Sequence, residues 1–224
     1  MKVDLFSIVL LVGIFQGIFL TLFLFFSKES EAKSNKILAA FIFAFTLLTL
    51  NDLLFNTKTI LEFPNLFLIL DPFILMLGPL AYFYIRAIVT KNKTIRTKDL
   101  IHFFPAGFLW LVLIPVYFQN KSSKEKLIME SISSIGEEPD FILILASLHL
   151  LVYFVISIFH LSKYQKEIKN SYSFSEKINL KWLKIFLIIT SVLWISFTIQ
   201  VLFQFYQLKS TNDLLFTISM YLIG

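Results

Sequence analysis

Six stretches of this 224-residue chain are long and apolar enough to cross a lipid bilayer, and this feature constrains the fold more than any other. A spanning helix needs about 20 mostly apolar residues, because each residue rises only about 1.5 Å through a hydrocarbon core of about 30 Å. The predicted spans are Leu5–Phe26, Ile37–Phe55, Leu66–Val89, Ile101–Phe118, Phe141–Leu161 and Leu183–Tyr206. A further apolar run opens at Asp213 and reaches Gly224, which predicts the start of a seventh helix cut short.

The composition agrees with a lipid environment. Hydrophobic residues make up 57% of the chain and the mean hydropathy is +0.78, both well above the usual values for soluble domains. Cysteine is absent, which excludes disulfides and thiolate metal sites. We therefore expect an all-α, polytopic membrane helix bundle with six complete spans and the lipid bilayer as its first partner. No motif predicts a catalytic site, a metal site or a cofactor.

The distribution of Lys and Arg predicts the orientation in the membrane, because cytoplasmic loops are enriched in both residues. One set of alternate connections holds 14 of the 20 basic residues, namely Lys28, Lys33, Lys36, Arg86, Lys91, Lys93, Arg96, Lys98, Lys163, Lys166, Lys169, Lys177, Lys181 and Lys184. We expect connections 27–36, 90–100 and 162–182 inside the cell and the N-terminus outside. A completed seventh helix would then end in the cytoplasm.

Four polar residues near the outer ends of spans are candidates for a ligand pocket, since polar groups in hydrocarbon are costly unless they face protein or water. They are Asp52, Asp71, Gln200 and Gln204. We expect Asp52 and Asp71 to face the bundle interior in a pocket that opens outward. The alternative is that both acids cap or end helices at the headgroup level, with Asp71 before Pro72 marking a break.

The fifth span carries a polar stripe of His149, Tyr153, Ser157 and His160, which recur at i, i+4, i+8 and i+11 on one helical face. We expect this stripe to point into the bundle, where buried hydrogen bonds between helices are its simplest role. His149 and Tyr153 join the candidate pocket.

Other features predict close packing and helix breaks. Gly13 and Gly17 form a G-x-x-x-G pair that favours close helix contact. Pro72, Gly78 and Pro79 are expected to interrupt the third span.

Two residues near the predicted inner surface, Arg86 and His102, each have a simple structural interpretation. Arg86 is expected to extend to lipid phosphates, and an ion pair is the alternative. His102 is expected to be a surface or interfacial histidine, with pH sensing as the alternative. On the outer side, the connection from Gln119 to Asp140 is expected to be a lid or a disordered linker.

The segment SYSFSEKINLKWLKIF precedes the sixth span at the predicted inner surface. Phe174, Ile178 and Trp182 recur every four residues and share one helical face. One interpretation is an interfacial belt that only anchors the chain. The other is a coupling segment that moves with the sixth span.

Three stretches resemble the N-terminal membrane region of bacterial membrane-bound AraC-type transcriptional regulators: LGPLAYFYIR, DLIHFFP and FSEKINLKWLK. The resemblance covers most of the chain in order and spacing. It implies that residues 1–224 form a seven-helix sensory module in the bacterial inner membrane. It also implies a cytoplasmic helix-turn-helix DNA-binding domain, which is absent from this chain, so DNA would be a partner only through that domain.

The expected function is therefore that of a non-enzymatic sensory module. It would respond to a small ligand or a membrane signal, alone or as a homodimer. The input module of a membrane histidine kinase and a small transporter-like protein are the alternatives. A transporter is disfavoured because the two halves of the chain lack repeat symmetry.

Overall fold

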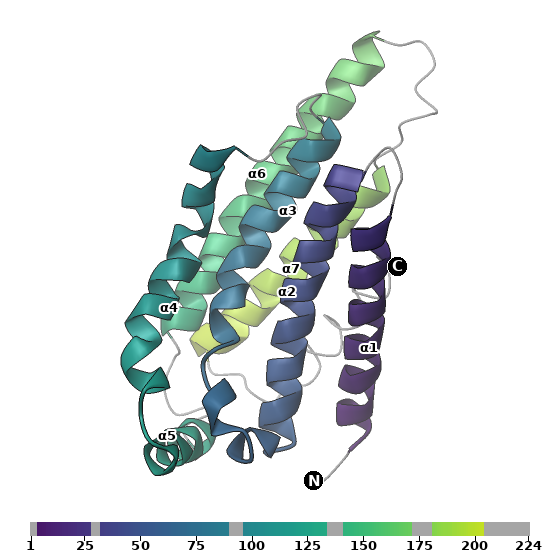
Figure 1. Cartoon of the computed structure of the whole chain (residues 1–224). Helices are drawn as coiled ribbons and strands as arrows, with labels where there is room; N and C mark the ends of the chain where they lie inside the picture. Colours follow the sequence, from purple (N-terminus) through teal and green to yellow (C-terminus); the bar gives the residue numbers. More distant parts are fainter. Residues whose placement is uncertain (1–3, 28–31, 90–95, 134–140, 172–180, 204–224) are drawn as a thin grey trace.

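The computed structural model describes residues 4–27, 32–89, 96–133, 141–171 and 181–203, and these residues form helices and turns throughout (Figure 1). The α-helices are α1 (Leu5–Phe26), α2 (Ala32–Asn56), α3 (Ile74–Val89), α4 (Phe104–Tyr117), α5 (Lys121–Ser133), α6 (Phe141–Ser171) and α7 (Lys181–Phe203). Short 3-10 helices are η1 (Thr59–Leu61), η2 (Pro64–Leu66), η3 (Asp71–Phe73) and η4 (Thr97–Phe103).

Among the described residues, five helical segments are long and apolar enough to cross a membrane, which confirms the predicted all-α fold and is compatible with a multi-pass membrane protein. They are Leu5–Phe26, Lys33–Asn56, Pro64–Val89, Thr97–Tyr117 and Ile142–Lys166. The sixth predicted span coincides with α7, whose apolar stretch Leu183–Ser196 is shorter than a membrane crossing. The predicted seventh run, from Asp213, lies outside the described residues.

The helices pack in successive pairs, α1 on α2, α2 on α3, α3 on α6 and α6 on α7, and α7 runs behind α2 and α3 in the view of Figure 1. Helix α4 lies beside η3 and η4, and its span is the least buried of the five. Phe104, Phe108 and Leu111 on α4 are exposed, as are Phe15 and Phe19 on α1. Such faces suit contact with lipid, whose acyl chains are as apolar as these side chains.

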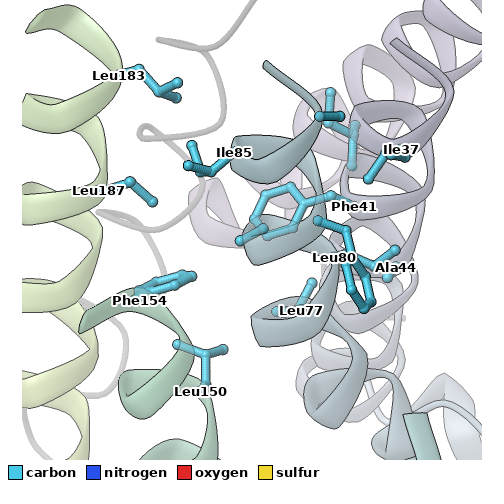
Figure 2. Close-up of a cluster of buried hydrophobic side chains, with 14 of the residues drawn as sticks. Ile37, Phe41, Ala44, Leu77, Leu80, Ile85, Leu150, Phe154, Leu183 and Leu187 are labelled. Atoms are coloured by element: carbon cyan, nitrogen blue, oxygen red, sulfur yellow. The ribbon is translucent and has the colours of Figure 1, made fainter. Parts of the chain in front are cut away.

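The main core lies where α2, α3, α6 and α7 meet. Phe83 and Phe154 are each 1% exposed at its centre. Figure 2 shows side chains from all four helices converging there, including Ile37, Phe41, Leu80, Ile85, Leu150, Phe154, Leu183 and Leu187. Within a bilayer, helix association depends on close van der Waals packing rather than on exclusion of water, so these contacts hold the bundle together.

Close packing of α1 on α2 depends on Gly17. A Cβ atom at Gly17 would collide with Thr46 Oγ1 and lie 3.2 Å from Thr46 Cβ. Gly13 is also buried on α1. Gly17 therefore does what the G-x-x-x-G pattern predicts, since its missing side chain lets a threonine of α2 approach the α1 backbone.

The third span is interrupted at Pro72, as the sequence predicts. Its first part consists of η2, a turn and η3, and the α-helix begins only at Ile74. Pro72 lies in η3, where its ring and missing N–H oppose an α-helix. In contrast, α3 continues through Gly78 and Pro79, so the predicted interruption at these two residues is wrong.

Side chains of α4 hold the non-helical part of the third span. Trp110 Nε1 donates a hydrogen bond to the carbonyl of Ile69 at 3.0 Å, and Tyr117 Oη donates to the carbonyl of Leu68 at 3.2 Å. Leu68 has a φ of 61°, in the left-handed region. The N–H and C=O groups of non-helical backbone at membrane depth need hydrogen-bond partners from protein or water. Trp110 and Tyr117 of α4 provide two of these partners.

The connection after α4 contains a helix, so the prediction of a disordered linker is wrong for residues 121–133, whereas that of a lid stays a prediction. Helix α5 packs on η1 and η2. Ile128 is fully buried in a small cluster with Leu54 and Ile60, and Lys124 Nζ donates to Asn65 Oδ1 at 2.8 Å. An amphipathic helix with a buried isoleucine gains contacts that a linker lacks.

The bundle has two ends, which we name by their short elements (Figure 1). The η4 end holds the last residues of α1, α3 and α6, the first residues of α2 and α7, and η4. The α5 end holds the first residues of α1 and α6, the last of α2 and α4, and α5. The described helix ends that flank connections 27–36, 90–100 and 162–182, which are predicted to be cytoplasmic, lie at the η4 end.

At the α5 end, polar side chains tie α1 to α2. Asp4 Oδ1 accepts hydrogen bonds from the Ser7 N–H at 2.8 Å and Ser7 Oγ at 2.7 Å. Asn56 Nδ2 donates to Ser7 Oγ at 3.1 Å. Hydrogen bonds from Ser7 lower the pKa of the Asp4 carboxyl, since they favour its ionised form. Asp4 therefore stays charged at neutral pH as the N-cap of α1.

Candidate functional site

An ion pair joins α3 to η4 at the η4 end. Arg86 Nη2 lies 2.6 Å from Asp99 Oδ2 and Arg86 Nη1 lies 3.2 Å from Asp99 Oδ1, a two-pronged arrangement. The side chains are 22% and 9% exposed. Asp99 Oδ2 also accepts the Arg96 N–H at 2.8 Å, so one carboxylate both caps η4 and binds the guanidinium.

This geometry corrects the expectation that Arg86 extends to lipid phosphates. Its guanidinium carbon lies 4.7 Å from the ring centroid of Phe83 and 5.8 Å from that of Tyr82. The expectation failed because η4 folds back beside α3 and brings Asp99 within reach. A partly desolvated carboxylate with fixed geometry holds a guanidinium better than solvent-exposed headgroups do.

A second link joins η4 to α6. His102 Nδ1 lies 2.7 Å from Tyr153 Oη, within hydrogen-bond distance. The His102 ring is half-buried and packs edge-on against Phe83, with ring centroids 5.4 Å apart. His102 is thus not an exposed surface histidine, whereas its predicted place at the membrane interface stays a prediction. It lies between α3 and α6 and connects them through its hydrogen bond and its ring contacts.

Tyr82 of α3 lies at the centre of the aromatic contacts. Its ring centroid is 6.1 Å from that of His102, 6.2 Å from that of Tyr153 and 5.7 Å from that of His160. We call Tyr82, Arg86, Asp99, His102 and Tyr153 the η4-end network. Its five side chains come from α3, η4 and α6.

The polar stripe of α6 faces this network. Tyr153 packs on the surface that Gly78 leaves open, since a Cβ at Gly78 would lie 3.0 Å from Tyr153 Cβ. His149 is half-buried and Ser157 is fully buried, whereas His160 is exposed apart from its contact with Tyr82. Most of the stripe therefore points toward the bundle, as its periodicity predicts.

Near the α5 end, a second polar contact joins α2 to η3. Asn51 Nδ2 lies 3.4 Å from Asp71 Oδ1, and Asn51 is only 8% exposed. Asp71 is half-buried, but Asp52 is exposed, so the prediction that both acids face the interior is wrong for Asp52. Successive residues of an α-helix point about 100° apart, and burial of Asn51 turns Asp52 outward.

The remaining candidates are described only in part or not at all. Gln204, Phe174 and Ile178 lie outside the described residues, and so do the side chains of Gln200 and Trp182. The predicted outward pocket and the coupling segment therefore stay predictions. Among the described residues, no group of three or more histidine or acidic side chains is placed to hold a metal ion.

Sequence reasoning missed three residues of these sites: Asn51, Tyr82 and Asp99. Asp99 carried a usable signal, because it stands three residues after Arg96 at the start of an apolar run, the spacing of a helix cap. Asn51 and Tyr82 carried none, since one polar residue in an apolar run does not reveal which neighbour it contacts.

Comparisons with protein-family models, curated proteins and solved structures find no match to this chain.

Proposed function

We propose that residues 1–224 are the membrane-embedded sensory module of an AraC-type transcriptional regulator, which passes its state to a cytoplasmic helix-turn-helix DNA-binding domain. The module itself would perform no catalysis. The resemblance of LGPLAYFYIR and DLIHFFP to that family motivates the proposal. The first stretch contains Tyr82 and Arg86, and the second contains Asp99 and His102. These are four of the five residues of the η4-end network.

The observation that carries the proposal is this network. The 2.6 Å contact between Arg86 and Asp99 links α3 to η4, and the 2.7 Å contact between His102 and Tyr153 links η4 to α6. Polar contacts of this kind are rare in apolar bundles and are costly to maintain, so they favour a functional role over simple anchoring. Through these two contacts, a change in the packing of α3 would change the position of α6.

Helix α6 is suited to carry such a change out of the membrane. Its 31 residues span about 46 Å, well beyond a hydrocarbon core of about 30 Å. In Figure 1 its last turns project past the neighbouring helices at the η4 end. A ligand that favours one of two packings by about 1–3 kcal/mol would alter the position of this projection.

The proposal includes six spans, with α7 as the sixth, and an outside N-terminus in a bacterial inner membrane. The η4 end would then be cytoplasmic, where its basic residues meet anionic lipid. The segment with Phe174, Ile178 and Trp182 would connect the projecting end of α6 to α7 and act as the coupling segment. Asp71, His149 and Tyr153 stay candidates for recognition of a small ligand.

The sequence encoded after Gly224 tests the proposal directly. A pair of helix-turn-helix units joined to the module would support the regulator. A phosphoacceptor histidine followed by an ATP-binding domain would instead make the chain the input module of a kinase. A stop codon would favour a self-contained membrane protein, such as a small transporter, and would overturn the proposal.

A further inference from the structure

His102 is the titratable side chain that stands between the two polar links of the η4-end network. Element η4 is a 3-10 helix, in which residues three apart lie one above the other. Asp99 and His102 have this spacing, so they share one face of η4. The ring of Phe83 contacts both the Arg86 guanidinium and the His102 imidazole. A change at His102 can therefore reach the ion pair on one side and the contact with Tyr153 on the other.

The hydroxyl group of Tyr153 requires a particular form of the His102 ring. Tyr153 is half-buried, and among the described residues His102 is the one hydrogen-bond partner of its hydroxyl. The hydroxyl can donate its hydrogen across the 2.7 Å contact only if Nδ1 of His102 has a free lone pair. The form of the ring that satisfies the hydroxyl is therefore the neutral imidazole with its hydrogen on Nε2.

We propose that protonation of His102 changes the packing of η4 against α6, so that the module responds to pH. In the imidazolium both ring nitrogens carry hydrogen, and Nδ1 can only donate to Tyr153 Oη. The Tyr153 hydroxyl then has no acceptor among the described residues, which is unfavourable for a half-buried group. Histidine side chains ordinarily change charge between about pH 5 and pH 8, so the change falls in the physiological range.

The charges around His102 link its protonation to the ion pair of Arg86 and Asp99. Helix α4, which also packs on η4, has no charged side chain. The other charged or titratable groups around the ring are the exposed Arg96 and Lys98 on η4, Tyr82 on α3, and His149, Tyr153 and His160 on α6. Each carboxylate oxygen of Asp99 already accepts a hydrogen bond from Arg86. An imidazolium on the same face of η4 would compete with the guanidinium for this carboxylate, so the proton would also affect the link to α3.

Two spin labels measure the change in packing, because the chain has no cysteine of its own. Lys98→Cys on η4 and Lys166→Cys on α6, both at exposed positions, would carry the labels on the full chain in lipid nanodiscs. Between about pH 8 and about pH 5.5 we expect the mean distance between the labels to shift by about 1–2 Å, the size of helix shifts in other switching proteins. The same distance at both pH values would overturn the proposal. That result would leave the regulator proposal standing, which rests on the network and names no signal.

Histidine variants locate the response. His102→Gln should abolish the shift, because a glutamine side chain gains no proton in this pH range. The double variant His149→Gln/His160→Gln keeps His102 as the one histidine of the chain and should retain the shift in full. The opposite pattern would reject His102 as the switch. If His102→Gln does not fold, the double variant still decides: NMR of its single imidazole gives the pH at which His102 gains its proton. A label distance that shifts at that pH supports the proposal, and one that shifts at a different pH contradicts it.

Discussion

At the scale of single residues, two glycines determine how closely neighbouring helices approach. Gly17 accommodates Thr46 of α2, and Gly78 accommodates Tyr153 of α6. Thr46 Oγ1 already donates to the carbonyl of Ile42 at 2.8 Å, so it cannot move away without loss of that bond. Gly107 on α4 has no atom within 4 Å of the position that a Cβ would take, which makes it a matched control.

Gly17→Ala should therefore lower stability by about 1–3 kcal/mol, because the added methyl group overpacks the contact between α1 and α2. Gly107→Ala should leave the Tm unchanged or raise it slightly, since alanine favours helix over glycine. Thermal unfolding of both variants in the same detergent measures the difference. Equal effects on the Tm would show that Gly17 does not hold the two helices together.

At the scale of elements, Asp99 couples η4 to α3. Asp99→Asn keeps the size of the side chain but removes its charge, so Arg86 would lose its ionic partner within the protein interior. We expect the Tm to fall measurably. Arg86→Gln in the same background should restore part of that loss, because the guanidinium that has lost the Asp99 carboxylate is then gone.

The measurement is a double-mutant cycle on thermal unfolding, with the exposed Lys98→Gln as the control. A coupling free energy near zero between Arg86 and Asp99 would mean that the ion pair contributes nothing to the packing of η4.

Also at this scale, local sequence patterns predicted elements better than contacts. The bounds of α1 match its predicted span, because a long apolar run in lipid has few alternatives to a helix. The break before Ile74 was foreseen from Pro72, but its hydrogen bond from Trp110 was not. The helix α5 was not foreseen, since it depends on a partner distant in sequence, Asn65. The stripe on α6 was foreseen, but not its hydrogen bond to His102.

At the scale of the whole molecule, the orientation across the membrane can be read from two surface lysines. Lys98 is exposed at the η4 end and Lys126 at the α5 end. Since the native chain has no cysteine, each single cysteine variant reports one end alone. With an outside N-terminus, an impermeant thiol reagent should label Lys126→Cys in intact cells and Lys98→Cys only after permeabilisation. The reverse pattern would invert the proposed orientation.

The proposal that this bundle is the sensory module of a regulator is tested most directly by the transcripts that depend on it. A strain that lacks the gene would be complemented, at matched protein levels, with the full-length unmodified gene, with Tyr153→Phe or with Tyr164→Phe. Tyr153→Phe removes the hydroxyl that meets His102, and Tyr164→Phe is the same change three turns along α6. We predict that Tyr153→Phe changes gene-dependent transcript levels several-fold, as expected for a coupling of about 1–3 kcal/mol, whereas Tyr164→Phe leaves them unchanged. The account would be contradicted if no transcript level depended on the gene. It would also be contradicted if both variants changed the gene-dependent transcript levels equally.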